Sequence, residues 1–182
     1  IQYGTSMCYP VSSMGSHVSV VPNHQLNRKT PLHTRANVAY FGTFGYELDL
    51  NKLSDEEISE VKQQITFMKE YRELIQFGTF YRLKSPFEGN ETVWMTVSED
   101  KKTALVFWYR ERNVVNADFT RVRLQGLDPD LIYRNEYNET ENYGDELMNL
   151  GLLTTDCTAG EPTSEDEPCT DYESRIYVLT AK

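Results

Sequence analysis

Residues 54–77 carry the clearest helical pattern in the chain. Ser54 and Glu57 have the spacing of a capping box, in which each side chain accepts a hydrogen bond from the other residue's backbone N–H. Apolar residues then recur every three or four positions, which is the spacing of one helix face. This stripe consists of Ile58, Val61, Ile65, Met68 and Ile75, with one charged member, Arg72. Gly78 follows the stripe, so we predict an amphipathic helix that ends there.

Beyond residue 79 the hydrophobic period shortens to two, which is the period of a strand with one buried face. The polar residues 98–102 and the Gly-Leu-Asp-Pro-Asp sequence at 126–130 are typical of turns. The strands predicted around these turns are 91–98, 103–110, 119–125, 131–135 and 175–180. Short strands at such regular spacing predict an antiparallel β-sandwich.

The first 53 residues show a mixed pattern. Residues 12–21 lack a helical period, and we interpret them as a short buried strand that ends before Pro22. A helix is predicted to start at Thr30 and Pro31, with Thr30 as the N-cap and Pro31 at the first helical position, where a missing N–H costs nothing. Apolar and small residues continue this helix along one face until Gly42 interrupts it.

The composition excludes several classes of protein. Eighteen Lys and Arg residues against 28 Asp and Glu residues leave a net charge of −10, whereas nucleic-acid binders need a basic face. Hydrophobic residues make up 39% of the chain and aromatic residues 12%, which is enough to build a core. No apolar run approaches the roughly 18 residues of a membrane span. We therefore expect neither a nucleic acid nor a membrane as partner. Because the chain begins at Ile1 rather than Met, we also expect it to be a piece of a longer protein.

Residues that could bind metals or form disulfides are scattered. Of the three cysteines, Cys157 and Cys169 flank a short acidic segment and could pair, or they could remain reduced like Cys8. No Cys or His residues have the spacing of a zinc site, and the acidic residues within 139–146 lack the calcium-loop pattern. We predict no metal and no cofactor, and we interpret residues 160–173 as a solvated acidic loop.

Three groups of residues have both a functional and a structural interpretation. Trp94 and Trp108 alternate with β-branched and apolar residues, so they are core residues or, if one points outward, a sugar-stacking platform. Asp128 and Asp130 flank a proline, which is typical of a turn rather than of a catalytic pair. His17 has serines close by but no G-x-S-x-G sequence to suggest nucleophilic catalysis, so it is a structural or a ligand-facing residue.

Short sequence blocks run in a fixed order through the first 152 residues. They lie at 1–6, 9–10, 14–19, 22–25, 30–35, 45–49, 74–78, 81–83, 85–90, 126–129 and 144–152. In content, order and spacing, these blocks resemble the bacterial α-galactosidases of glycoside hydrolase family 36. His33 departs from the family pattern, which usually has a Glu that would complete a capping box. Residues 154–173 are longer and more acidic than the usual ending of the family.

The resemblance implies an architecture. Family members have an N-terminal β-sandwich, a central (β/α)8 barrel and a C-terminal antiparallel β domain. This chain would be an α+β fragment, in which the last strand and helix of the barrel precede an amphipathic helix and a C-terminal antiparallel β-sandwich domain. The implied domains are 1–53 for the C-terminal part of the catalytic barrel, 54–78 for a connecting helix and 79–182 for the β-sandwich. Within the first domain, 1–9 would finish the seventh barrel helix, 12–20 would be the eighth strand and 30–41 the eighth helix.

The resemblance also implies an activity for a parent enzyme. Family members are retaining glycosidases with two catalytic Asp residues, both of which would lie upstream of Ile1, so this fragment alone would be inactive. The parent would hydrolyse terminal α-galactosides, such as melibiose and raffinose-type oligosaccharides, without a cofactor or metal. It would be a cytoplasmic homo-oligomer, and the chain would need the upstream barrel residues as its partner. An alternative from another class is a non-catalytic carbohydrate-binding or structural β-sandwich module.

His17 and Ser19 are the candidate substrate-binding residues. They alternate with Val18, so they share one face of the predicted strand. The resemblance places the C-terminal end of this strand at the barrel face where such enzymes bind substrate. We hypothesise that His17 shapes the galactose pocket, or orients a catalytic carboxylate by a hydrogen bond, without transferring protons itself. The alternative is that His17 is a buried core residue.

Overall fold

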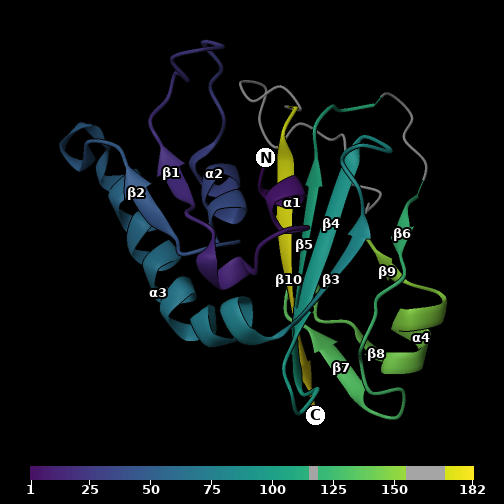
Figure 1. Ribbon diagram of the computed structural model, residues 1–182. Helices are drawn as coiled ribbons and strands as arrows, with labels where there is room; N and C mark the ends of the chain where they lie inside the picture. The colour runs from purple at the N-terminus through teal and green to yellow at the C-terminus, as the bar shows by residue number, and fades with distance from the viewer. Residues whose placement is uncertain (115–118, 155–170) are drawn as a thin grey trace. The chain divides into compact units, whose positions relative to one another are not determined.

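The computed structural model describes residues 1–114, 119–154 and 171–182, which fold into two compact units. The first unit is Ile1–Gly78 and the second is Thr79–Lys182 (Figure 1). No helix within the described ranges combines the length and the apolar character needed to cross a membrane. Cys157, Cys169 and most of the predicted acidic loop 160–173 lie outside the described residues.

The first unit consists mainly of helices, with one pair of short strands. These strands, β1 and β2, pair in parallel, and helix α2 makes the connection between them that a parallel pair requires. The longest helix, α3, follows β2. In chain order the elements are α1 (Gln2–Thr5), a 3-10 helix (Val11–Ser13), β1 (His17–Ser19), α2 (Leu32–Ala39), β2 (Gly45–Glu47), a second 3-10 helix (Leu50–Lys52) and α3 (Asp55–Phe77).

Strand β1 is shorter than the strand predicted at 12–21. The residues before it form a 3-10 turn, in which the Ser13 hydroxyl donates a hydrogen bond of 2.9 Å to the carbonyl oxygen of Pro10. Such a local side-chain bond offers the backbone an alternative to strand pairing. Within β1, Val18 is fully buried while the residue on either side is exposed. The predicted alternation therefore holds over these three residues only.

Helix α2 begins one residue later than predicted. Pro31 is its N-cap, with extended backbone angles, and makes no side-chain capping bond. The carbonyl oxygen of Thr30, the predicted cap, accepts a hydrogen bond of 3.0 Å from Arg35 Nε, while Arg35 Nη1 donates to the carbonyl oxygen of Ser19 at 2.6 Å. Arg35 thus holds the start of the helix against the end of β1, an interaction that the local sequence pattern does not contain.

Helix α3 confirms the prediction at its N-terminus. The backbone N–H of Glu57 donates to Ser54 Oγ at 3.2 Å, and the backbone N–H of Ser54 donates to Glu57 Oε2 at 2.9 Å. Both halves of the capping box are therefore formed. Gly78 follows the last helical residue, and its N–H donates to the carbonyl oxygen of Leu74 at 2.9 Å.

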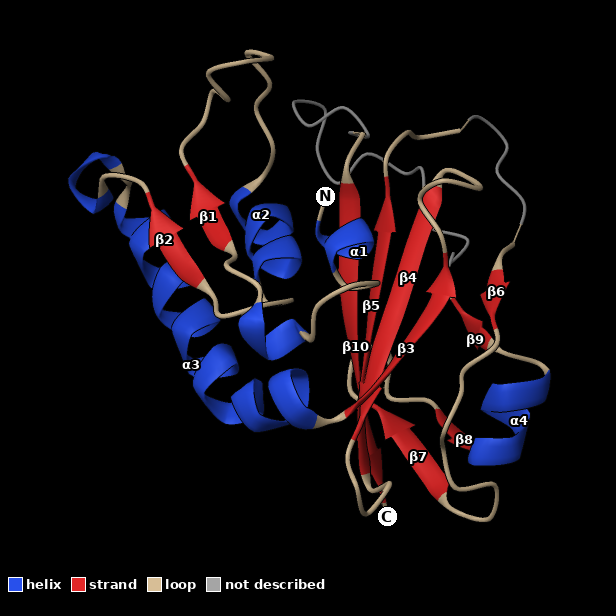
Figure 2. Cartoon of the chain, in the orientation of Figure 1, coloured by secondary structure: helices blue, strands red, loops and turns tan. Residues whose placement is uncertain are grey.

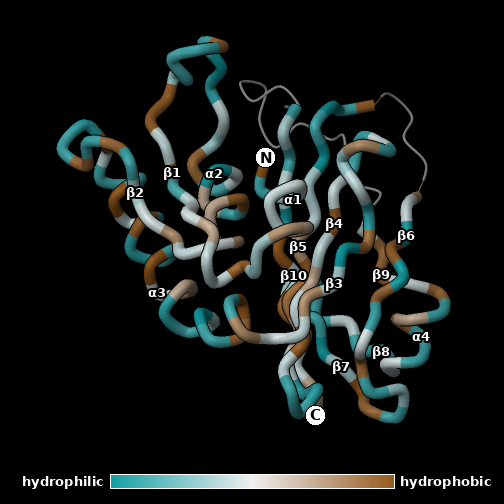
Figure 3. The backbone as a smooth tube through the Cα atoms, in the orientation of Figure 1, coloured by the Kyte–Doolittle hydropathy of each residue, from teal (hydrophilic) through white to brown (hydrophobic). Residues whose placement is uncertain are grey.

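Hydrophobic and hydrophilic residues alternate along α3 (Figure 3). Only part of the predicted apolar stripe is buried. Its buried apolar residues are Val61, Met68 and Ile75. Arg72 is exposed and does not belong to the buried face. Gln64 is buried instead: its Nε2 donates to Glu60 Oε1 at 2.7 Å, and its Oε1 accepts a hydrogen bond from Tyr46. Hydrogen bonds to Glu60, one turn back in α3, and to Tyr46, on a neighbouring segment, thus satisfy the buried side chain of Gln64.

The second unit is built from antiparallel strands with one short helix (Figure 2). Six strands form a sheet in the order β3-β4-β5-β10-β7-β8, and two more, β6 and β9, form a small second sheet. The elements are β3 (Thr79–Lys84), β4 (Glu91–Val97), β5 (Thr103–Arg110), β6 (Arg121–Val122), β7 (Ile132–Asn135), β8 (Glu141–Tyr143), α4 (Gly144–Asn149), β9 (Leu152–Leu153) and β10 (Glu173–Ala181). Every strand pair described in this unit is antiparallel, which confirms the predicted class of this region.

The core of the second unit takes alternate residues from the central strands. Strands β4, β5 and β10 contribute Val93, Met95, Val97, Ala104, Val106, Trp108, Tyr177 and Leu179. Residues from the small sheet, the turns and α4 complete the same cluster. Spacing by two within this cluster agrees with the alternation of side chains between the faces of a strand. The prediction of a single buried face is wrong for β4 and β5, because the intervening residues Trp94, Leu105 and Phe107 are also buried.

The short elements of the second unit differ from the prediction. The strand predicted at 119–125 is reduced to the two residues of β6, whose partner β9 is itself two residues long. Helix α4 was not predicted. It is held by bonds to distant backbone: Gly144 N–H donates to Leu131 O at 2.9 Å, and Leu147 O accepts from Leu124 N–H at 3.1 Å. A six-residue helix is not stable by itself, so these tertiary bonds account for its presence.

The predicted turn at 126–130 is present. The backbone N–H of Asp130 donates to Asp128 Oδ1 at 3.1 Å, which is the side-chain bond expected of an aspartate in a turn. The Tyr133 hydroxyl accepts a hydrogen bond from the N–H of Asp128 at 2.9 Å and donates one to Lys101 O at 2.6 Å. Burial raises the pKa of Tyr133, so its hydroxyl remains a donor at neutral pH. These bonds confirm a structural role for the two aspartates.

Candidate functional site

Strands β1 and β2 present one exposed polar face. His17 and Ser19 are both exposed, and so is Glu47, the register partner of Ser19. Register partners in a parallel pair project to the same side of the sheet. His17, Ser19 and Glu47 therefore share one face, with Gly45 directly opposite His17. His17 and Ser19 lie on a common face of β1, as their alternation with Val18 predicts.

The opposite face of the same strand pair is buried. Val18 is 0% exposed, and the hydroxyl of its register partner Tyr46 donates a hydrogen bond of 2.8 Å to Gln64 Oε1 on α3. Removal of water from around the Tyr46 hydroxyl raises its pKa to about 12, and the negative charge of Glu60 adds to the effect. This face is thus fixed to the helix layer, and His17 and Ser19 lie on the opposite face.

The hydrophobic pattern does not single out Gly45 and Glu47 as members of this face. Both residues lie in the block at 45–49, which carries part of the family resemblance. The hydrophobic pattern could not show that this block pairs with β1, because the partner of a parallel strand is not set by a local turn. In the structure, residues 17–19 pair one to one with residues 45–47.

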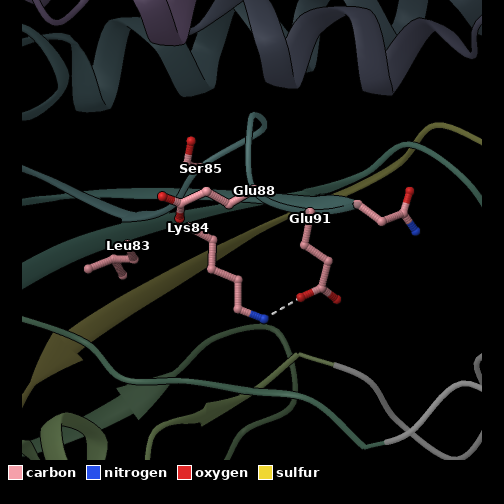
Figure 4. A pocket seen from close by; sticks show the side chains of 7 residues that line it. Leu83, Lys84, Ser85, Glu88 and Glu91 are labelled. Carbon is pink, nitrogen blue, oxygen red and sulfur yellow. Dashed lines mark hydrogen bonds and ion pairs between the residues drawn. The ribbon is translucent and has the colours of Figure 1, made fainter.

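A second candidate is a cleft of about 240 Å³ at the connection between β3 and β4 (Figure 4). It is lined by Leu83, Lys84, Ser85, Glu88, Gly89, Asn90 and Glu91. Figure 4 shows the Lys84 ammonium group directed at the Glu91 carboxylate, with which it forms an ion pair. Glu91 Oε1 also accepts from the Thr120 hydroxyl at 3.2 Å, and the Asn90 side chain bonds the backbone of Arg112 in both directions, at 2.7 and 2.9 Å. Since these groups bond within the chain, they favour a structural role for the loop.

Neither tryptophan forms a sugar-stacking surface. Trp94 is 3% exposed and Trp108 is 1% exposed. The guanidinium groups of Arg110 and Arg175 lie 5.3 and 5.6 Å from the ring centroid of Trp108, within the range of cation–π attraction. The core interpretation of both tryptophans is therefore confirmed.

Metal-ligand residues do not gather in the described part of the chain. Within residues 1–114, 119–154 and 171–182, no three His, Cys, Asp or Glu side chains lie close enough together to hold a metal ion. The three histidines are all exposed, and Cys8 is an exposed free cysteine.

Both units match the models of known protein families. The Melibiase family model matches residues 1–78, and the model of the glycosyl hydrolase family 36 C-terminal domain matches residues 91–179. Alpha-galactosidase AgaA of Geobacillus stearothermophilus is 53% identical over 152 residues, which are 84% of this chain and 21% of AgaA. Alpha-galactosidase 1 of Pediococcus pentosaceus is 46% identical over 181 residues, which are 100% of this chain and 23% of that protein.

Solved structures give the same result. The crystal structure of AgaA has a TM-score of 0.88 and 47% identity over 100% of this chain and 24% of its own. The α-galactosidase of Lactobacillus brevis has a TM-score of 0.91 and 43% identity over the same shares. The two units are therefore those of a glycoside hydrolase. More narrowly, the chain belongs to glycoside hydrolase family 36, and it spans between 21% and 24% of the length of these relatives.

Proposed function

We propose that this chain is part of an α-galactosidase that hydrolyses terminal α-galactosides with retention of configuration. The observation that carries the proposal is the successive match of residues 1–78 and 91–179 to the two family models. Variants of AgaA have been crystallised with raffinose and with stachyose, and we assign the same class of substrate to the whole protein. Both catalytic Asp residues would precede Ile1 in the parent, because no Asp or Glu of this chain lies in a matching motif.

We further propose that the first unit is the end of a (β/α)8 barrel. Two features support this: β1 and β2 pair in parallel through the crossover helix α2, and β2 leads directly into another helix, α3. Such a β1-α2-β2-α3 order is two successive turns of the strand–helix repeat from which these barrels are built. The family resemblance assigned the barrel to 1–53 and a connecting helix to 54–78. The observed order favours a barrel segment that includes α3, followed by the β-sandwich of 79–182. In this segment β2 and α3, rather than residues 12–20 and 30–41, would be the eighth strand and helix.

Within this barrel segment, we propose that His17 and Ser19 contribute to the galactoside pocket. In such barrels the substrate binds at the C-terminal ends of the strands. In the parallel pair these ends are Ser19 and Glu47, and the face that they share with His17 is exposed. Hydroxyl, carboxylate and imidazole groups supply the donors and acceptors that sugar hydroxyls need. His17 would shape the pocket or orient a catalytic carboxylate, without transferring protons.

The test compares the intact parent enzyme with the 182-residue chain. We expect the parent to release galactose from melibiose and raffinose, with the α anomer as the first product detected by NMR, and the chain alone to release none. A parent that is inactive on both sugars, or that releases the β anomer first, would contradict the proposal. Calorimetry of the chain alone tests the alternative function. If the chain binds galactosides while the parent is inactive, the chain is a carbohydrate-binding module.

We also propose, from the family resemblance, that the parent is a homo-oligomer and acts in the cytoplasm. Light scattering of the purified parent tests the first statement. Fractionation of the cells that produce it tests the second.

A further inference from the structure

The imidazole ring of His17 lies beside two glycines. A Cβ atom built on Gly45 would be 3.1 Å from His17 Cδ2 and 3.7 Å from its Nε2. A Cβ atom built on Gly15 would be 3.9 Å from His17 Cε1, an ordinary contact distance. The imidazole ring therefore occupies space next to Gly45 that the side chain of any other residue at position 45 would partly fill.

The backbone does not explain why position 45 is a glycine. The described glycines with positive φ are Gly42, Gly126 and Gly151, so Gly45 adopts backbone angles that any residue can take. A glycine inside a strand weakens it and commonly marks a close approach by another group. At Gly45 that group is the imidazole of its register partner His17.

We propose that Gly45 is a positioning residue for His17 in the galactoside pocket; this inference rests on the proposed function. By leaving out a side chain, Gly45 lets the imidazole lie over β2, so that its nitrogens are held at one place on the exposed face. A ring nitrogen there is set to bond a sugar hydroxyl or a neighbouring carboxylate. A methyl group at position 45 displaces the ring by a few tenths of an ångström and leaves the strand pairing intact.

The experiment uses four variants of the intact parent enzyme: Gly45→Ala, His17→Ala, the double variant, and Gly89→Ala as the matched control. Gly89 lies in a different unit, and an added Cβ there meets nothing within 4 Å. We measure kcat and KM on melibiose, together with the melting temperature. Small displacements of a group that contacts the substrate are costly, so we expect Gly45→Ala to lower kcat/KM about 3- to 10-fold. Gly89→Ala should leave kinetics and melting temperature unchanged.

The double variant separates positioning of His17 from a general structural effect. If Gly45 acts through the imidazole, adding Gly45→Ala to His17→Ala produces no further loss, because the displaced group is absent. If Gly45→Ala prevents folding, the same reasoning predicts that His17→Ala restores it, since the crowding atoms are removed.

Two outcomes overturn the inference and leave the proposed function standing: normal kinetics for Gly45→Ala where His17→Ala is impaired, or an equal loss from Gly45→Ala with and without His17. Normal kinetics for His17→Ala overturn both the inference and the pocket role of His17. An unmodified parent without α-galactosidase activity overturns the proposed function itself, and the inference with it.

Discussion

The backbone of Gly144 lies directly against the carbonyl oxygen of Asp128. A Cβ atom on Gly144 would overlap that oxygen and would also crowd the ring of Tyr133. The contact joins two of the sequence blocks, the turn at 126–129 and the segment at 144–152 that contains α4. These blocks are thus parts of one packing arrangement, in which the start of α4 closes over the turn.

The close contact predicts that Gly144→Ala destabilises the chain. The new methyl group meets backbone atoms, which cannot move aside as a flexible side chain can, so we expect a loss of about 2 kcal/mol or more in the free energy of unfolding. Urea denaturation of the intact parent that carries the variant measures it. Gly89→Ala is the control, because its Cβ enters open space. Equal midpoints for the two variants would show that the contact does not constrain the fold.

The capping box of α3 predicts a smaller loss. Ser54→Ala removes the acceptor for the N–H of Glu57, and loss of such a cap costs about 1 kcal/mol. Ser59→Ala, at an exposed position inside the same helix, should be neutral or slightly stabilising, since Ala is the better helix former. Circular dichroism followed through urea denaturation compares the two. A midpoint for Ser54→Ala at or above that of Ser59→Ala would contradict the prediction.

The half-buried side chain of Tyr46 predicts a dependence of stability on alkaline pH. Its pKa is about 12 in the folded chain against the usual 10.0, so the folded state holds this proton more tightly than the unfolded state. The contribution to stability is complete below pH 10 and is lost as the pH rises through 12. Stability should therefore fall more steeply over this range in the native chain than in Tyr46→Phe. Tyr143→Phe, at an exposed tyrosine, should behave like the native chain.

The proposed pocket role of His17 predicts a kinetic loss that is separate from any effect on folding. In the intact parent, His17→Ala should lower kcat/KM on melibiose, since a group that contacts the sugar or orients a carboxylate is lost. The pocket role predicts that the melting temperature changes little while kcat/KM falls. A large fall in melting temperature without a kinetic effect would instead assign His17 a structural role.

The long elements of this fold could be predicted because their signals lie within the elements themselves. Helix α3 carries its own cap and most of its buried stripe, and β4 and β5 are largely apolar segments on either side of a polar turn. The short elements could not. Helix α4 and strands β6 and β9 depend on bonds to distant backbone, such as that between Leu124 and Leu147. The start of α2 depends in the same way on Arg35.

Half of the candidate site could be predicted from the sequence. Alternation along one strand was enough to place His17 and Ser19 on a common face. Gly45 and Glu47 complete that face only through the register of β1 with β2, and parallel pairing leaves no local trace in the sequence. The close approach of Gly45 to an imidazole ring is a property of two strands together, so no pattern within either strand reveals it.

Strand β10 lies between β5 and β7 although it follows both of them in the chain. It pairs with β5 from Glu173 to Thr180 and with β7 from Leu179 to Ala181. During synthesis, β3-β4-β5 and β7-β8 leave the ribosome as two separate groups, each with an open hydrogen-bonding edge. These edges remain available to other nascent chains until residues 173–181 emerge between them. The six-stranded sheet therefore closes only after residues 173–181 have been synthesised.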